Sequence, residues 1–366
     1  MSNVCYDAAR YAQLRKTYNA WWNNELDRPI VSIITKGHPT TVKPTDTPLL
    51  AFHTAWDPQI TPQMFIDAYD YDFSISKFHG DCFPRLNTSR FGAGVLAAFL
   101  GCEPIPSPET TWFLPRRKDI PLDQLHFEYD KESPWLRRIL DFIECGMERW
   151  KGDVVICMPD LGGVLDVLAS FRSAQDLLLD LYDDPDEVKR CIKEIQSAWF
   201  ECFEHINSYL KPGAQGYSDW FGLYYDEPGY ILQSDFSYMI SPDMFREFVG
   251  WDLADSGSRM KHTVYHMDGV GQIPHLDQLT AIDSIDAIQF VPGIGSHEND
   301  NFDHVFSAIL KSGKKLVSRS QKQDGSPFDA VKNHLGQLYF QPRTYALDNL
   351  DAARAYAEMY NIPLDL

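Results

Sequence analysis

Residues 286–318 read DAIQFVPGIGSHENDNFDHVFSAILKSGKKLVS and contain one full unit of the pattern that decides the fold. The apolar run at 286–291 is typical of a buried strand, and residues 302–311 have the apolar spacing of a helix that ends before Gly313. A second apolar run follows at 315–318. A strand, a helix and another strand in immediate succession predict two parallel strands with the helix packed against them.

The same alternation extends along the chain in both directions. Strands are expected near residues 30, 83, 153, 214, 263, 286, 315 and 337. Helices are expected at 6–25, 133–150, 186–210, 241–259, 272–280, 302–311, 329–335 and 349–360. Eight strands alternating with helices predict an α/β fold of the (β/α)8 TIM-barrel type. A doubly wound open sheet is the alternative, and it is disfavoured because no glycine-rich phosphate-binding turn follows any strand.

We interpret residues 1–366 as a single barrel domain, because inserted loops commonly bring barrels to this length. Residues 1–150 form a divergent, irregular amino-terminal part that includes the first two strands and long loops at 37–61 and 104–121. Residues 151–366 contain regular βα units.

The composition is typical of a cytoplasmic globular protein. Apolar residues make up 44% of the chain and charged residues 23%, which is enough for a sizeable core. The net charge of −19 argues against a nucleic acid or an anionic membrane as partner, because both need a basic patch. No membrane span is expected, and the polar start at 1–12 lacks the pattern of a signal peptide. The seven cysteines are odd in number and widely spaced, which indicates buried thiols in a reducing compartment.

Polar and aromatic side chains follow the predicted strands at their carboxyl ends, where barrels build their sites. Such charged groups would be costly in a packed interior, so their positions favour a polar cavity. Several have a structural alternative: helix capping or loop ordering for Asp160 and Asp219, and packing for the aromatic residues. The alternatives are a satisfied structural histidine for His266 and a solvated carboxylate for Glu298. The candidates are Asp160, Asp219, Trp220, Tyr224, His266, Asp268, Glu298, Arg319 and Arg343.

His266 and Asp268 lie two residues apart at the end of one predicted strand, where they can act together. Residues i and i+2 of a strand face the same side, so both groups can converge on one metal ion or one substrate proton. An imidazole and a carboxylate suit Zn²⁺ or another borderline divalent ion. Glu298 or His297, in the loop after the next strand, is the expected third ligand. Without a metal, the same residues would make an acid–base pair.

The chain resembles the uroporphyrinogen decarboxylase superfamily in several local patterns that occur in the family's order. The matching stretches are Asn24–Pro29, Pro159–Asp166, Leu177–Leu181, Asp184–Val188, Ile240–Phe248 and, in place of the family's His-x-Cys-Gly turn, Tyr265–Gly269. The resemblance implies a barrel fold. The family includes tetrapyrrole decarboxylases and zinc-dependent methyltransferases, which move methyl groups between a corrinoid and a thiol or a related acceptor.

Two departures from the family pattern affect the expected chemistry. The decarboxylases carry an arginine-rich amino-terminal motif, which this chain lacks, and a net charge of −19 is unfavourable for a polyanionic porphyrinogen. The methyltransferases hold zinc with His-x-Cys and a later cysteine, whereas here Asp268 replaces the first cysteine and no cysteine follows Cys202. A bound metal would therefore have nitrogen and oxygen ligands and act as a Lewis acid or orienting ion.

We therefore expect a methyltransferase acting on a small methylated compound, with a corrinoid taking part only through a partner protein. His266 and Asp268 would hold the metal or move a proton, while Asp160 and Asp219 would orient the substrate. The two candidate aromatic residues would cover the site. The two candidate arginines would pair with a carboxylate or phosphate, because a planar guanidinium suits such groups.

Three other functions stay open. A decarboxylase would use Asp160 as the acid that protonates the carbanion left by loss of CO₂. A glycoside hydrolase would use Asp160 and Asp219 as its two carboxylates. A non-catalytic ligand-binding protein would account for the missing cysteines. A homodimer is also left open, because barrels often dimerise and the sequence carries no interface signal.

Overall fold

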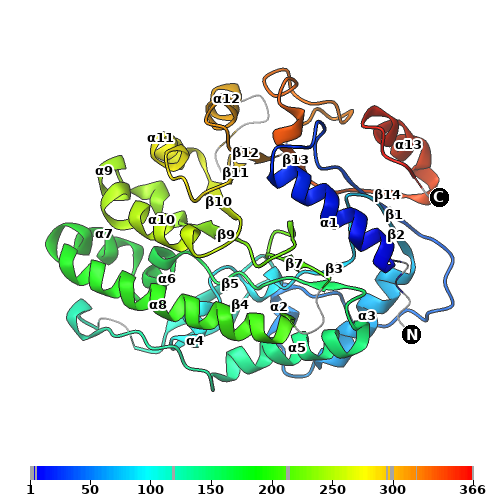
Figure 1. Cartoon of the computed structure of the whole chain (residues 1–366). Helices are drawn as coiled ribbons and strands as arrows, with labels where there is room; N and C mark the ends of the chain where they lie inside the picture. The colour runs from blue at the N-terminus through cyan, green and yellow to red at the C-terminus, as the bar shows by residue number, and fades with distance from the viewer. Residues whose placement is uncertain are drawn as a thin grey trace.

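The computed structural model describes residues 4, 6–117, 120–211, 215–293, 296, 301–318 and 320–364. A parallel five-stranded sheet lies at the centre of the fold (Figure 1). Its strands, in sheet order, are β13 (Leu338–Phe340), β12 (Lys315–Ser318), β11 (Ala287–Val291), β10 (Thr263–Asp268) and β9 (Tyr230–Gln233). Strands that follow one another in the sequence are neighbours in the sheet, as expected when helices make the connections.

Further strands lie beyond both edges of the central sheet. They are β1 (Ser32–Lys36), β2 (Ser76–Gly80), β3 (Arg85–Leu86), β4 (Cys102–Pro106), β5 (Thr111–Pro115), β6 (Val155–Ile156), β7 (Tyr217–Ser218), β8 (Tyr224–Tyr225) and β14 (Arg343–Ala346). A parallel bridge between Ile30 and Tyr339 joins the start of β1 to β13. β3 pairs in parallel with β6, and the Met158 amide after β6 donates to the Ser218 carbonyl of β7 (2.8 Å).

Helices surround the strands (Figure 1). The longest begins at Pro185, whose fixed φ suits a first helical turn, and has Asp186 and Glu187 beside its positive end. The helices are α1 (Ala8–Trp22), α2 (Phe52–Ala55), α3 (Pro62–Ser74), α4 (Leu96–Phe99), α5 (Pro134–Trp150), α6 (Val164–Phe171), α7 (Ala174–Asp183), α8 (Pro185–Leu210), α9 (Pro242–Phe245), α10 (Trp251–Ser258), α11 (Leu276–Thr280), α12 (Asp303–Lys311) and α13 (Leu350–Met359).

Helix α1 covers the amino-terminal ends of the central strands with aromatic side chains. The Trp22 ring stacks on His262, which precedes β10, with 4.4 Å between the ring centroids. The Lys315 ammonium, at the start of β12, donates to the Asn24 side chain just beyond α1 (2.6 Å). Because α1 covers the amino-terminal ends of the strands, a site is expected at their carboxyl ends.

The predicted mixed α/β fold is confirmed, whereas a closed eight-stranded barrel is not: the paired strands of the described residues form separate sheets. Residues 329–333 form turns, so the helix predicted at 329–335 is wrong. The strand predicted near 214 is reduced to Tyr217–Ser218 in the described part of the chain. On the side of β10 away from β11, the neighbouring strand is β9, which the sequence pattern did not reveal.

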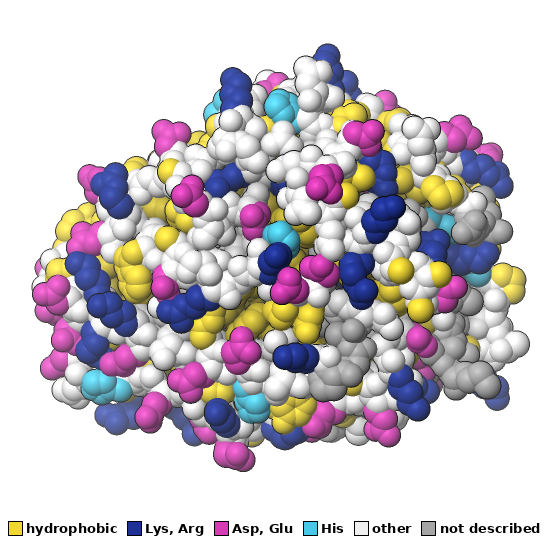
Figure 2. Space-filling view, viewed as in Figure 1, with side chains coloured by type: hydrophobic (Ala, Val, Ile, Leu, Met, Phe, Trp, Pro, Cys, Tyr) yellow, Lys and Arg dark blue, Asp and Glu magenta, His cyan; other side chains and the backbone are white. Residues whose placement is uncertain are grey.

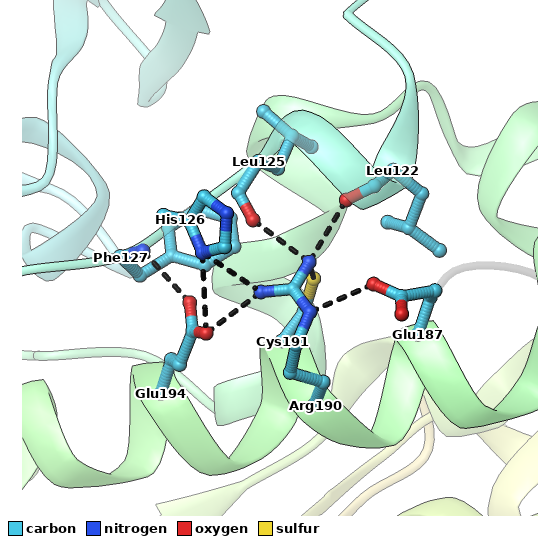
Figure 3. Close-up of polar contacts among 8 residues, drawn as sticks. All are labelled: Leu122, Leu125, His126, Phe127, Glu187, Arg190, Cys191 and Glu194. Carbon is cyan, nitrogen blue, oxygen red and sulfur yellow. Dashed lines mark hydrogen bonds and ion pairs between the residues drawn. The ribbon is translucent and has the colours of Figure 1, made fainter.

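Arg190 on α8 fastens the irregular segment 120–127 to the helix (Figure 3). Its guanidinium donates to the carbonyls of Leu122 (3.0 Å) and Leu125 (2.9 Å) and pairs with Glu194 one turn later (2.7 Å). Glu194 in turn accepts the amide proton of Phe127 (3.0 Å). Charged hydrogen bonds to backbone groups therefore hold a segment that has little regular secondary structure.

Acidic and basic side chains are intermixed on the face drawn in Figure 2, and no basic patch gathers there. The negative net charge is therefore spread over this surface rather than concentrated. Among the described residues, no helix combines the length and the apolar character needed to cross a membrane.

Replacing Arg190 by alanine is expected to lower the free energy of unfolding by roughly 2–3 kcal/mol, because several charged hydrogen bonds are lost together. Urea unfolding measures this loss, and limited proteolysis of 120–127 should accelerate as well. Arg137→Ala is the matched control, since its bonds to Asp141 and Glu144 are exposed and such pairs contribute about 0.5 kcal/mol or less. Equal losses in the two variants would contradict the role given to Arg190.

Candidate functional site

Strand β10 presents His266 and Asp268 at its open end. Both side chains are partly exposed, whereas the other four residues of Thr263–Asp268 are buried. The two-residue period of a strand places both groups on one side of the sheet. The imidazole and the carboxylate therefore lie together, as their spacing in the sequence predicts.

A third residue, Asp235, completes a cluster with His266 and Asp268. Asp235 begins the 3-10 helix η4 (Asp235–Met239), directly after β9, whose last residue Gln233 pairs with His266. One ligand-type atom from each of the three residues lies within 4.8 Å of the other two. Neighbouring parallel strands end at the same edge of the sheet, and the cluster forms at that edge.

Asp166 on α6 fixes the backbone that carries Asp235. Its carboxylate accepts the amide protons of Asp235 (2.9 Å) and Phe236 (2.7 Å). Gly163 allows this contact: a Cβ atom at 163 would lie 2.1 Å from the Gln233 carbonyl oxygen and 2.5 Å from the Asp166 carboxylate. The glycine at the end of Pro159–Gly163 therefore serves the close packing of α6 against the end of β9.

The His266 ring is oriented by two neighbours. Its Nδ1 lies 2.7 Å from Oε1 of Gln289 on β11, so the ring donates its Nδ1 proton to the amide oxygen and Nε2 carries a lone pair. The edge of the Trp220 ring meets the imidazole at 88°, with 5.2 Å between centroids. Burial lowers the pKa of His266, although the Asp268 charge opposes this effect. A neutral imidazole of this kind can bind a metal or accept a proton.

The acidic groups around His266 repel one another in a partly buried place. Burial and then the Asp235 charge raise the pKa of Asp166 to about 7. Burial and then the Asp268 charge raise the pKa of Asp235 to about 6. A divalent cation would relieve this repulsion, because carboxylates gather around hard or borderline ions.

Asp160, in the loop between β6 and α6, is not a member of the His266 cluster but lies within electrostatic range of Asp235 and Asp166. One of its carboxyl oxygens accepts the Gly162 amide proton (3.0 Å). Burial raises the pKa of Asp160 to about 8. The group is therefore largely protonated at neutral pH, which suits a proton donor.

Asp219 stabilises the loop after β7 through hydrogen bonds. One carboxylate oxygen accepts the amide protons of Phe221 (3.0 Å), Gly222 (2.7 Å) and Leu223 (3.2 Å), and the other accepts the Tyr225 hydroxyl proton (2.5 Å). Burial raises its pKa to about 6. Asp219 therefore orders its own loop, which is the structural alternative to binding the substrate. The ordered loop holds the neighbouring Trp220 against His266.

The remaining sequence candidates lie elsewhere. Tyr224 is fully buried, and its hydroxyl donates to the Gln215 carbonyl (2.7 Å), so it packs the interior instead of covering the site. Arg343 donates to the carbonyls of Lys322 (3.2 Å) and Gln323 (3.3 Å), so its guanidinium supports a turn. The candidates at 297, 298 and 319 lie outside the described residues.

A cavity of about 650 Å³ opens beside the cluster, between the β4–β5 hairpin and α6. Asp166 and Asp235 line it together with Trp112, Phe113 and Phe171. The guanidinium of Arg172, another wall residue, is occupied by both carboxylate oxygens of Asp180 (2.8 and 3.0 Å). Of the cluster residues, Asp235 therefore borders a space large enough for a small molecule.

Three contributors to this site were missed by sequence reasoning: Asp166, Asp235 and Gln289. Asp166 ends the Pro159–Asp166 stretch that carries the family resemblance, and its position there was the available signal. Asp235 follows the apolar residues 230–232, and recognising these as a strand would have placed it at the sheet edge. Gln289 pairs in register with His266, which only the strand pairing reveals.

Comparison with known proteins gives a similar structure but no similar sequence. No family model matches the chain, and no curated protein matches it. A methyltransferase from Methanosarcina mazei has a similar structure, with a TM-score of 0.57 and 14% sequence identity. The similarity covers 95% of this chain and 98% of the methyltransferase. At this identity, the match establishes a shared fold.

Substituting alanine for Gly163 should move α6 away from β9, because the added Cβ meets backbone and carboxylate oxygens. We expect a loss of roughly 1–3 kcal/mol in the free energy of unfolding. Gly250→Ala is the control, since the nearest atom to its Cβ would lie 3.7 Å away. Chemical denaturation compares the variants, and an unchanged stability of Gly163→Ala would refute the close packing described above.

The raised pKa of Asp160 predicts a pH dependence of stability. Folding favours the protonated acid, so this contribution is complete below about pH 4 and is lost as the pH rises through about 8. Asp160→Asn keeps a neutral side chain. The stability of the wild type should therefore fall between pH 5 and 9 by several kcal/mol more than that of Asp160→Asn, at about 1.4 kcal/mol per pKa unit. Parallel pH profiles of the two proteins would argue against a neutral Asp160.

Proposed function

We propose that this chain is a methyltransferase-type enzyme that acts on a small methylated compound, in a fold related to the uroporphyrinogen decarboxylase superfamily. The observation that carries the proposal is the cluster of Asp235, His266 and Asp268 at the ends of adjacent parallel strands. The fold shared with a methyltransferase over almost the whole chain supports it. The proposal includes a corrinoid, delivered by a partner protein, as a source of the methyl group.

We further propose that the strands form a (β/α)8 barrel. The Ile30–Tyr339 bridge supports closure between β13 and β1, and the pairing of β3 with β6 supports the next step around the ring. In this arrangement β9 is the fourth parallel strand. The β7–β8 hairpin then fills the space between β6 and β9, where the Trp220 indole donates to the Ile231 carbonyl (3.2 Å).

The cluster residues fit a divalent metal ion. One imidazole nitrogen and two carboxylate oxygens form a nitrogen and oxygen set that suits Zn²⁺ or a similar ion. The bond from His266 Nδ1 to Gln289 would orient the ring and leave Nε2 as the ligand atom. Asp235 takes the place that the sequence prediction gave to Glu298. When bound, such an ion supplies Lewis-acid polarisation and orientation of the reacting group.

The protein side chains have distinct roles in this proposal. Asp166 holds the backbone of Asp235 in place. The Trp220 ring lies against His266 and limits the access of water to it. In the absence of a metal, Nε2 of the neutral His266 can accept a proton from the substrate.

A decarboxylase is the second candidate, and one observation favours it. Asp160 is a buried acid whose pKa, raised by burial to about 8, keeps a proton available at neutral pH. A carbanion formed by loss of CO₂ needs such a donor. A decarboxylase would show CO₂ release that Asp160→Asn abolishes, whereas a methyltransferase would show no such release.

Elemental analysis of the purified protein tests the metal centre. We expect about one divalent ion per chain in the wild type and none in His266→Ala, because three ligands are the minimum for such a site. Asp235→Asn should reduce the affinity for added Zn²⁺ by roughly tenfold or more. Asp243→Asn is the control, because Asp243 is exposed on α9 and pairs with Arg246 on the same stretch of helix. Equal metal content in wild type and His266→Ala would contradict the proposed centre.

A further inference from the structure

Arg85 is an arginine inside the fold whose charge has no counter-ion among the described residues. It begins β3 and pairs in register with Val155 of β6. Its guanidinium lies 5.7 Å from the centre of the Phe83 ring. Across the described ranges, it makes no ion pair and no side-chain hydrogen bond. The residue as a whole keeps some solvent-accessible surface, whereas its guanidinium is surrounded by protein.

The groups around Arg85 are neutral at physiological pH. Its electrostatic neighbours are Tyr339, Cys157, Cys82 and Tyr18. Burial raises the pKa of the Cys82 thiol to about 11 and that of the Cys157 thiol to about 12, so neither is a thiolate. The guanidinium therefore has no anion beside it in these residues.

Two acidic residues in the neighbouring segments are already occupied. Asp81, four residues before Arg85, binds both terminal nitrogens of Arg28 (2.5 and 2.9 Å) and the Val31 amide (2.8 Å). Asp219 uses both oxygens on the backbone and hydroxyl donors of its own loop. In a chain with 52 acidic residues, an inner arginine without a carboxylate is therefore unusual.

Two buried hydroxyl groups near Arg85 make no hydrogen bond of good geometry in the described part of the chain, although each lies beside a weaker partner, the Tyr339 hydroxyl and the Cys157 thiol respectively. They are the Tyr18 hydroxyl on α1 and the Ser218 hydroxyl on β7, both in side chains that are at most 2% exposed. Tyr18 lies within electrostatic range of Arg85, and Ser218 lies beside Cys157, which is also in range of Arg85. Because these local contacts are poor, both hydroxyl groups can turn towards a stronger acceptor placed beside the unpaired guanidinium.

One short loop links Arg85 to the proposed metal centre. Gly222 lies so close to Arg85 that a Cβ atom there would stand 2.4 Å from Nε of the guanidinium. Two residues earlier, Trp220 meets the imidazole of His266. Residues 220–222 therefore connect the guanidinium of Arg85 to the imidazole of His266.

We propose that Arg85 binds the carboxylate of the substrate, so that the enzyme acts on a small carboxylate-bearing compound. A guanidinium presents two parallel donors that match a carboxylate, and the two hydroxyl groups can supply further hydrogen bonds. A single guanidinium balances one negative charge, which favours a carboxylate over a phosphate dianion. The inference rests on the proposed function for the reaction. It assigns to Arg85 the pairing with a substrate anion that sequence analysis gave to Arg319 and Arg343.

The test measures the binding of simple carboxylates to the full-length protein. Acetate, propionate and benzoate are titrated calorimetrically, with sodium chloride at equal ionic strength and the corresponding uncharged amides as controls. Inorganic phosphate is titrated in parallel. We expect at least one carboxylate to bind, its amide not to bind, and Arg85→Gln to weaken the binding by roughly tenfold or more, because charge-assisted bonds are lost. Arg343→Gln, at an arginine that holds a turn, should bind as the wild type does.

Thermal unfolding separates a binding role from a structural one. Without ligand, Arg85→Gln should melt at the same temperature as the wild type or higher, since an unpaired charge has been removed from the interior. Arg85→Lys, which keeps the charge but lacks the paired donors, should fold and bind carboxylates more weakly. A large fall in the melting temperature of both variants would show a structural arginine and overturn the proposal.

The same titrations distinguish failure of this inference from failure of the proposed metal centre. His266→Ala should lose the metal and keep carboxylate binding at Arg85. Carboxylate binding that disappears in His266→Ala and persists in Arg85→Gln would place the anion on the metal and overturn the inference alone. Absence of binding by every carboxylate, or phosphate binding that exceeds theirs, would also overturn it.

Discussion

The close approach of α6 to the end of β9 is the constraint on which the candidate site depends. Gly163 permits it, since any larger residue would collide with the Gln233 carbonyl. The contact lets Asp166 bind the backbone amides of Asp235 and Phe236. An acidic residue on a strand-to-helix turn would otherwise sample many orientations, and this bond fixes one of them beside β10. Helix packing, not the side chain itself, therefore determines where Asp235, the third member of the cluster, lies.

The sequence predicted those parts of the fold that a local pattern determines. Apolar runs flanked by helical spacing identified β10 to β13, and the two-residue period placed His266 and Asp268 on one side. Strand β9 was missed because its four residues form a run too short to separate from the preceding hairpin. That omission also hid Asp235, whose place follows from the pairing of β9 with β10. Barrel closure depends on contacts between distant segments, which no local pattern determines.

The candidate site residues show the same difference between what a local pattern determines and what depends on how the chain folds. The position of Asp219 after a predicted strand suggested a substrate contact, but its four hydrogen bonds to its own loop depend on how residues 221–225 fold back. Arg343 likewise follows β13 and turns to carbonyl groups of the preceding loop. A residue type and its place at a strand end are therefore insufficient to identify a binding group. What distinguishes one is hydrogen-bonding capacity that the protein leaves unused.

Unused hydrogen-bonding capacity distinguishes Arg85 from other arginines of this chain. Arg28 and Arg172 each face a carboxylate in paired geometry, and Arg190 is saturated by backbone and acidic groups. Such arginines stabilise the fold, and their charges are already balanced by carboxylates. Arg85 has its donors free within the described residues and lies behind the loop that carries Trp220 to His266. Because an unpaired inner charge weakens the folded state, its retention is best explained by an anion that enters and leaves.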